Sequence, residues 1–291
     1  MPTQALAAAA LTLNALVWGV SWWPFRGLQG YGLHPLWATA LIYVFALVCL
    51  LAFRPQAWRG WGAHPLLWLL LVASGLTNVG FNWAVTVGDV VRAVLLFYLM
   101  PAWVVLLAWP MLGEKPTGGS LLRLLLALTG VVIVLKTPTS PWPVPESLPD
   151  WLALMGGFCF ALTNILLRKL NQTSEASRML AMFAGGAVMA VLAAVSGMQL
   201  GVVNSPPAPG VAWVGLVLVV SLAFLVGNLG LQYGAARLSA NATSLIMLSE
   251  VVFASASAVL LGSGELSART LAGGALILLA SLLSVMSFRK R

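Results

Sequence analysis

Four amide side chains recur in two matching segments of the sequence. Residues 78–84 read NVGFNWA and residues 228–234 read NLGLQYG, so the two segments match in residue type at one constant offset. The amides are Asn78, Asn82, Asn228 and Gln232, and in each segment they share one helix face because they are four residues apart. Asn14 and Asn164 add amides in two further apolar segments. Because an amide both donates and accepts hydrogen bonds, this set could bind the amine or carboxylate of a solute.

Aromatic and sulfur-containing side chains supply a second kind of candidate surface. These residues are Trp18, Trp22, Phe97, Tyr98, Met100 and Phe160. Pro24 and Pro101 lie nearby, and each proline removes a backbone donor, which frees the carbonyl of Val20 and of Phe97. We expect a kink or hinge at each proline. The kinks either shape a cavity for an aromatic or aliphatic group, or only bend the helices.

Glu250 is the one carboxylate expected near the middle of an apolar segment. The other six acidic residues fall in loops or at segment ends. An ionisable group placed inside a membrane is a functional candidate by default. Glu250 could bind a cationic group or a proton and so couple transport to it, or it could be a structural carboxylate that fixes its helix to a neighbour.

The composition requires a membrane environment. Of 291 residues, 60% are hydrophobic and 8% are charged, whereas a soluble domain carries roughly a quarter charged residues. So few charges cannot cover a water-facing surface. The net charge of +8 does not indicate nucleic acid, because the basic residues stand at the ends of apolar segments without interleaved aromatics. We expect the lipid bilayer, and no nucleic acid, to surround the chain.

Apolar length, interrupted by glycine, proline and charge, predicts an all-α membrane protein with ten transmembrane helices. The predicted spans are 6–25, 34–53, 65–86, 91–112, 119–136, 151–168, 178–198, 211–232, 240–262 and 269–288. Five prolines between residues 137 and 150 deny that connection a helix. The predicted organisation is a five-helix repeat over residues 1–137, a proline-rich linker over 138–150 and a second five-helix repeat over 151–291.

The basic residues predict the orientation, because lysine and arginine near span ends are retained on the cytoplasmic side. With a cytoplasmic amino terminus, that side holds eleven of them: Arg54, Arg59, Lys115, Arg123, Arg168, Lys169, Arg178, Arg237, Arg289, Lys290 and Arg291. The opposite side holds four, which are Arg26, Arg92, Lys136 and Arg269. An even number of spans then places both termini in the cytoplasm.

The two halves match beyond the amide segments. Trp18 is followed eight residues later by Arg26, and Phe160 is followed at the same distance by Arg168. Five spans per repeat is an odd number, so the second half must cross the membrane in the opposite sense. Inverted repeats around a central cavity recur in transporters, where they can open one site to either side in turn. Duplication also produces channels, which remain an alternative.

Amides within the third and eighth spans allow two interpretations. A buried amide without a partner costs about 2–7 kcal/mol, whereas a hydrogen bond between membrane helices recovers about 0.6 kcal/mol on average. The amides are therefore a poor device for stability alone and could line a wet cavity. The alternative is that they join helices beside the small residues Gly80, Ala84, Gly230 and Gly234.

The sequence lacks the motifs of enzymes. It has no zinc-protease pattern, phosphate loop or serine nucleophile elbow. His34 and His64 stand before prolines without a partner for a metal, and Asp89 lacks the second intramembrane aspartate of an aspartyl protease. We therefore expect no enzymatic activity, no cofactor and no metal site.

The chain resembles the drug/metabolite transporter superfamily of the EamA-like type, and within it the bacterial aromatic amino acid exporter group. The residues that carry the resemblance are the two five-helix halves, the spacing of Trp18 and Arg26, the segment 98–101 (YLMP) and the Gly-Glu endings at Glu114 and Glu265. The resemblance covers essentially the whole chain.

The resemblance implies an inner-membrane exporter with a central cavity lined chiefly by helices 1, 3, 4, 6, 8 and 9. It places Trp18, Met100 and Phe160 in that cavity, although Met100 and Phe160 stand where the exporter group usually has tryptophan. Glu250 is followed by Val251 instead of the proline of the broader pattern. We expect a monomer that exports aromatic and other amino acids by alternating access. Export of drugs or other metabolites, or a channel for solutes or ions, are the alternatives.

Overall fold

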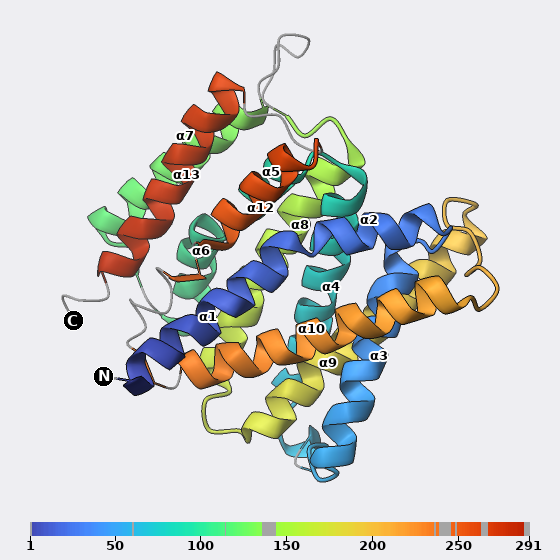
Figure 1. Cartoon of the computed structure of the whole chain (residues 1–291). Helices are drawn as coiled ribbons and strands as arrows, with labels where there is room; N and C mark the ends of the chain where they lie inside the picture. Colours follow the sequence, from blue (N-terminus) through green and yellow to red (C-terminus); the bar gives the residue numbers. More distant parts are fainter. Residues whose placement is uncertain are drawn as a thin grey trace.

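A computed structural model describes residues 2–59, 61–113, 115–135, 144–235, 237–238, 246–247, 249–262 and 267–287. Within these ranges every regular element is a helix, as predicted (Figure 1). A helix satisfies all its backbone hydrogen bonds within its own segment, which is what an apolar sequence in lipid requires. The helices are α1 (Pro2–Val20), α2 (Trp22–Gly30), α3 (Pro35–Phe53), η1 (Trp61–Ala63), α4 (Leu66–Val87), α5 (Val90–Phe97), α6 (Met100–Leu112), α7 (Gly118–Leu135), α8 (Leu148–Lys169), α9 (Glu175–Gln199), α10 (Val211–Ala235), α12 (Ser249–Leu260) and α13 (Ala268–Ser287).

The described residues form ten apolar helical stretches, which fall into a long class and a short class. Seven are long and apolar enough to cross a membrane: Gln4–Gly30, Pro35–Phe53, Leu66–Val87, Val90–Leu112, Leu148–Lys169, Glu175–Gln199 and Val211–Leu231. Three are shorter: Gly118–Val134, Ser249–Leu260 and Ala268–Ala280. Each of the ten overlaps a span predicted from the sequence, with different bounds in several cases. Part of the predicted ninth span, residues 240–245 and 248, lies outside the described residues.

The first span is longer than predicted. The sequence suggested an end at residue 25 because Arg26 follows, but the helical stretch continues to Gly30. The Arg26 guanidinium reaches the end of α4, where Nε donates to the carbonyl of Thr86 at 3.0 Å and a second nitrogen donates to that of Gly88. These carbonyls lie at the end of α4 and just after it, where no later helical amide can donate to them, so the partly buried arginine satisfies them.

The helix after the proline-rich segment begins before residue 150, the predicted end of the linker. α8 begins at Leu148 and includes Pro149 in its first turn. Proline is tolerated there because the amide it lacks would have no helical partner. Ser147 precedes the helix, and its hydroxyl accepts a hydrogen bond from the backbone of Asp150. Residues 136–143 lie outside the described part of the chain.

Two predicted spans are each built from two helices. The first span breaks between α1 and α2 at Ser21, three residues before Pro24. The fourth breaks between α5 and α6 at Tyr98 and Leu99, and Pro101 stands in the first turn of α6. Both breaks therefore lie beside the prolines that free a backbone carbonyl.

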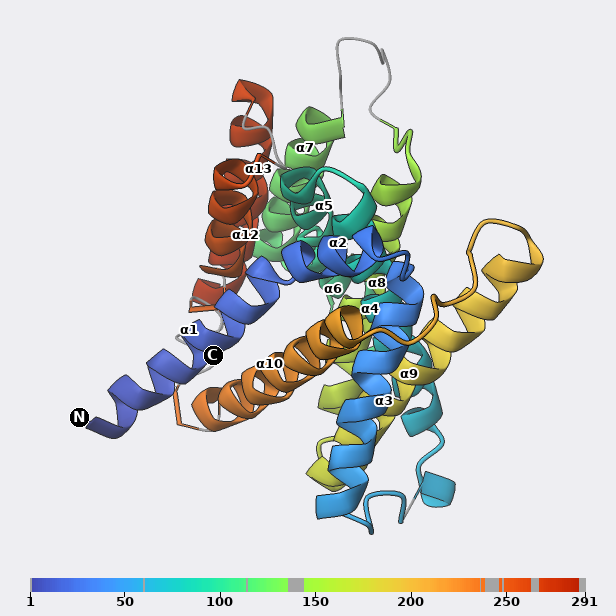
Figure 2. The same ribbon diagram turned by 45° about the vertical axis from the view of Figure 1, so that its right-hand side comes forward.

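The helices form a bundle with α7 and α13 side by side at one edge and α3 and α9 at the other (Figure 1). α4 packs between α8 and α9, and α1 packs along α10 and α12. The start of α1 and the end of α13 lie on the same side of the molecule (Figure 2).

Glycines let several helix pairs approach closely. A Cβ atom added at Gly80 in α4 would lie 2.6 Å from the carbonyl oxygen of Leu152 in α8. One added at Gly230 in α10 would lie 2.7 Å from the carbonyl oxygen of Ala10 in α1. Small residues at such crossings are typical of membrane helices, where close packing replaces the hydrophobic effect as the force that holds helices together.

Candidate functional site

Five aromatic rings from five helices meet inside the bundle, and we call them the aromatic cluster: Trp18 (α1), Phe81 (α4), Phe97 (α5), Phe160 (α8) and Phe224 (α10). Trp18 stacks on Phe224 with ring centroids 4.6 Å apart and meets Phe81 edge-on at 6.2 Å. Phe97 lies 4.7 Å from Phe81 and 5.5 Å from Phe160. The cluster thus forms a continuous aromatic surface, of the kind that holds an apolar side chain.

A sixth helix joins this site through polar contacts. The Tyr98 hydroxyl, in the break between α5 and α6, donates to Glu250 Oε2 in α12 at 3.0 Å. The indole nitrogen of Trp22 donates to the Ser257 hydroxyl, also in α12, at 3.0 Å. Tyr98 is buried, and its ring lies 6.1 Å from that of Phe97. Glu250 therefore stands at the edge of the aromatic cluster with a neutral hydrogen-bond donor.

The amides of α4 face α3 rather than the aromatic cluster. Asn78 accepts a hydrogen bond from the Tyr43 hydroxyl at 2.5 Å and donates to the Ser74 carbonyl at 2.8 Å. Asn82 Nδ2 lies 3.1 Å from the Thr39 hydroxyl, while its Oδ1 has no partner among the described residues. Both side chains are buried. In this conformation these two amides join α3 to α4. This agrees with the interpretation that the amides connect helices, the alternative to lining a wet cavity.

The amides of α8 and α10 follow the aromatic cluster directly. Asn164 Nδ2 donates to the carbonyl of Phe160 at 2.9 Å, and Asn228 Nδ2 donates to the carbonyl of Phe224 at 3.0 Å. Each amide therefore stands one turn after a ring of the cluster, and both helices belong to the second half of the chain. The side chain of Gln232 lies outside the described part of the chain.

The remaining candidates are placed as follows. Met100 begins α6 and packs, partly buried, against the hydrophobic core that contains Phe81 and Phe97. Trp22 is buried in the same region. Pro24 lies in the first turns of α2, and the side chain of Pro101 is outside the described residues.

Two rings of the cluster, Phe81 and Phe224, were absent from the predicted site. Phe81 stands inside the repeated segment 78–84, in which the sequence predicts only the two amides as site residues. Phe224 stands four residues before Asn228, as Phe160 stands four residues before Asn164. An aromatic residue one turn before an amide is therefore the signal that could have identified Phe224, whereas no amide follows Phe81 at that spacing. Tyr43, which supports Asn78 and lies 6.4 Å from the Phe224 ring, had no such signal.

A salt bridge ties the two halves together on the side of the linker. Arg92 Nε lies 2.7 Å from Asp150 Oδ1, and a second nitrogen lies 2.8 Å from Oδ2. The same guanidinium donates to the carbonyl of Val134 near the end of α7 at 2.8 Å. Arg92 thus connects α5, α7 and α8 through a bidentate contact, the strongest geometry for such a pair.

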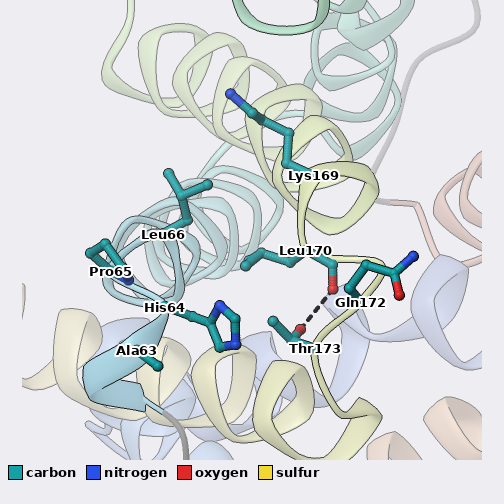
Figure 3. A pocket seen from close by; sticks show the side chains of 8 residues that line it. All are labelled: Ala63, His64, Pro65, Leu66, Lys169, Leu170, Gln172 and Thr173. Carbon is teal, nitrogen blue, oxygen red and sulfur yellow. Dashed lines mark hydrogen bonds between the residues drawn. The ribbon is translucent and has the colours of Figure 1, made fainter.

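A separate pocket of about 240 Å³ opens where α4 begins and α8 ends, beside the side chains of His64 and Lys169 (Figure 3). Its floor includes Leu170 and Thr173, whose hydroxyl donates to the Leu170 carbonyl at 2.7 Å. None of the predicted site residues lines it. Elsewhere, His34 caps α3 by accepting a hydrogen bond from the backbone of Leu36, and burial lowers the pKa of its imidazole.

Comparisons with known proteins give the family. The EamA-like transporter family matches the chain twice, over residues 5–136 and again over residues 147–286. No curated protein matches the chain in sequence. A solved structure, described only as the crystal structure of a protein, superimposes with a TM-score of 0.57 and 18% identity over 98% of each chain, which supports the fold alone. Because the family covers nearly the whole sequence in two copies, this multi-pass membrane protein belongs to the EamA-like transporter family.

Proposed function

We propose that this transporter exports amino acids, aromatic and others, together with related small metabolites, across the bacterial inner membrane by alternating access. The observation that carries the proposal is the aromatic cluster, to which five helices of both halves contribute a ring. The Tyr98–Glu250 pair at its edge adds hydrogen-bonding groups. Apolar and polar groups side by side match the two ends of an amino acid.

The proposed architecture is ten spans arranged as two inverted five-helix repeats around this site. The matched contacts of α4 with α8 and of α10 with α1 support it. The register that pairs Asn78 with Asn228 also pairs Gly80 with Gly230, and the register that pairs Trp18 with Phe160 pairs Ala10 with Leu152. Gly80 meets the carbonyl of Leu152, and Gly230 meets that of Ala10, at nearly equal distances. Both halves are thus assembled by the same contact.

The proposed orientation places both termini in the cytoplasm and the Arg92–Asp150 salt bridge on the opposite side. The excess of basic residues at one set of span ends supports it. The start of α1 and the end of α13 lie on one side, as an even number of spans requires (Figure 2). We propose that a monomer is sufficient, because the cluster is complete within one chain.

The broad specificity follows from the rings at the site. Phe160 and Met100 stand where the exporter group usually has tryptophan, and both are smaller or more flexible than an indole. An aromatic surface with such side chains accepts aliphatic as well as aromatic groups.

The test is uptake in proteoliposomes. The purified protein should take up labelled phenylalanine with saturation, and a panel of unlabelled amino acids should compete while sugars and inorganic ions do not. Trp18→Ala removes a ring that stacks on Phe224 and should raise KM by roughly three- to tenfold. The matched control is Trp23→Ala, because Trp23 is 61% exposed at the neighbouring turn.

The outcomes separate the alternatives. Competition by drugs or other metabolites, without competition by amino acids, would identify a different exporter of the family. Flux that grows linearly with the gradient and never saturates would indicate a channel. Equal KM values for Trp18→Ala and Trp23→Ala would remove the aromatic cluster from the substrate site.

A further inference from the structure

Asn14 in α1 is a buried amide with no hydrogen-bond partner in the part of the chain that the structure describes. Its side chain is fully buried, and neither Oδ1 nor Nδ2 meets a polar atom among the described residues. Its exposed fraction of 0% equals that of Asn82, which has one such partner. An amide buried without a partner is costly, because it gives up its hydrogen bonds to water and gains none in return. We therefore look for a role of this residue in a conformation in which α1 and α10 have separated.

Three glycines of α10 line its contact with α1 around Asn14, and we call this contact the seam. A Cβ atom at Gly227 would lie 3.3 Å from Asn14 Nδ2. Cβ atoms at Gly230 and Gly234 would lie 2.7 Å and 2.8 Å from the carbonyls of Ala10 and Ala7. The backbones of α1 and α10 thus approach closely beside the amide, which fills the space that Gly227 leaves.

The matching seam in the other half has no amide. In the repeat register Asn14 corresponds to Gly156 of α8, and Gly227 corresponds to Thr77 of α4. In that contact the glycine is Gly156 of α8, the helix equivalent to α1. A Cβ atom added at Gly156 would lie 3.4 Å from the carbonyl oxygen of Thr77 in α4. The close crossing therefore forms without an asparagine. Packing alone does not account for Asn14.

Asn14 also stands one turn before Trp18 on the same face of α1. Trp18 stacks on Phe224, and Phe224 stands one turn before Asn228 on α10. Separation of α1 from α10 would therefore open Asn14 towards the aromatic cluster. Asn14 lies in the first half of the span Gln4–Gly30, towards the amino terminus, which the basic-residue bias assigns to the cytoplasm.

We infer that Asn14 is a substrate-binding residue at a cytoplasmic entrance between α1 and α10. This inference rests on the proposed function. When the seam opens, Nδ2 donates to the carboxylate of an entering amino acid and Oδ1 accepts from its ammonium group. When the seam closes behind the substrate, the amide loses these partners, which favours reopening towards the cytoplasm.

The kinetic test compares variants in proteoliposomes with phenylalanine and with its decarboxylated analogue, phenethylamine. Asn14→Leu keeps the volume but loses both polar atoms, and should raise KM for phenylalanine by roughly three- to tenfold. Asn14→Asp keeps an acceptor and loses the donor, so KM should rise for phenylalanine and not for phenethylamine. Leu13→Ala, on the exposed face of α1, is the control and should change neither value. Unchanged KM for phenylalanine in both Asn14 variants would overturn the inference.

A second test does not need a known substrate. In a chain with Cys49 and Cys159 replaced by alanine, Asn14→Cys should react with a water-soluble maleimide added from the cytoplasmic side, and Leu13→Cys should not. Excess phenylalanine should slow the labelling. If Asn14→Cys never reacts, the entrance does not exist, whatever the substrate is. If it reacts but wild-type vesicles take up no amino acid, the entrance stands and the proposed substrate class fails.

Discussion

Buried asparagines in this protein differ in what surrounds them. Asn78 has two partners, the Tyr43 hydroxyl and the Ser74 carbonyl. Asn14 has none among the described residues, although both are buried in the bundle. The i to i+4 spacing of Asn78 and Asn82 predicted their shared face, but not which helix that face meets. Only the placement of α3, which carries Tyr43 and Thr39, shows that the face is a helix contact.

Replacing these two asparagines by leucine should therefore change stability in opposite directions. Asn78→Leu strands the Tyr43 hydroxyl and should lower the free energy of unfolding by about 1–3 kcal/mol. Asn14→Leu removes an unpaired amide and should raise it by about 1–3 kcal/mol. Thermal unfolding in detergent measures both. A loss of stability in Asn14→Leu as large as in Asn78→Leu would show that Asn14 has partners after all.

The Tyr98–Glu250 hydrogen bond joins equivalent spans of the two halves and should be measurable as a coupling. A double-mutant cycle with Tyr98→Phe and Glu250→Leu should give a coupling energy of about 1 kcal/mol in thermal unfolding. Glu250→Gln keeps an acceptor oxygen, so Tyr98→Phe should remain destabilising in that background. Additive effects of the first two substitutions would mean that the two side chains do not interact.

At the scale of helices, local charge and proline rules predicted the spans well but misplaced some of their ends. The sequence rules place Arg26 and Pro149 outside the helices, whereas Arg26 lies in α2 and Pro149 in α8. Arg26 is tolerated because it reaches the terminal carbonyls of α4, a contact between segments sixty residues apart. A rule that sees only neighbours in sequence cannot anticipate such a partner. The breaks beside Pro24 and Pro101, by contrast, depend on the backbone of the proline itself and could be expected.

The glycine crossings make a prediction about helix pairs. Gly80→Ala and Gly230→Ala each force a methyl group against a carbonyl of α8 or α1, and should each lower the free energy of unfolding by about 1–3 kcal/mol. Gly215→Ala in α10 meets nothing within 4 Å and should raise it by about 0.5–1 kcal/mol. Chemical denaturation of the three variants checks this. Equal changes in the free energy of unfolding at all three positions would mean that helix propensity, and not the close approach of the helices, determines the effect of these substitutions.

At the scale of the whole molecule, the sequence predicted the all-helical class, and its internal match indicated duplication. The family match in two copies confirms the superfamily. The aromatic cluster could be predicted only in part, because a ring such as Phe81 carries no local mark that separates a central position from a lipid-facing one. The meeting of the rings depends on how five helices from two halves assemble. The repeat register is nevertheless visible in the structure, since Gly80 and Gly230 make the same contact.

The central claim is alternating access to one site, and counterflow tests it most directly. Proteoliposomes loaded with unlabelled phenylalanine should take up external labelled phenylalanine faster than empty vesicles, with transient accumulation above the external concentration. A carrier shows this because the loaded site returns faster than the empty one. Phe160→Ala should weaken the effect, and Trp23→Ala should not. Uptake that is identical in loaded and empty vesicles, and linear with concentration, would contradict the account.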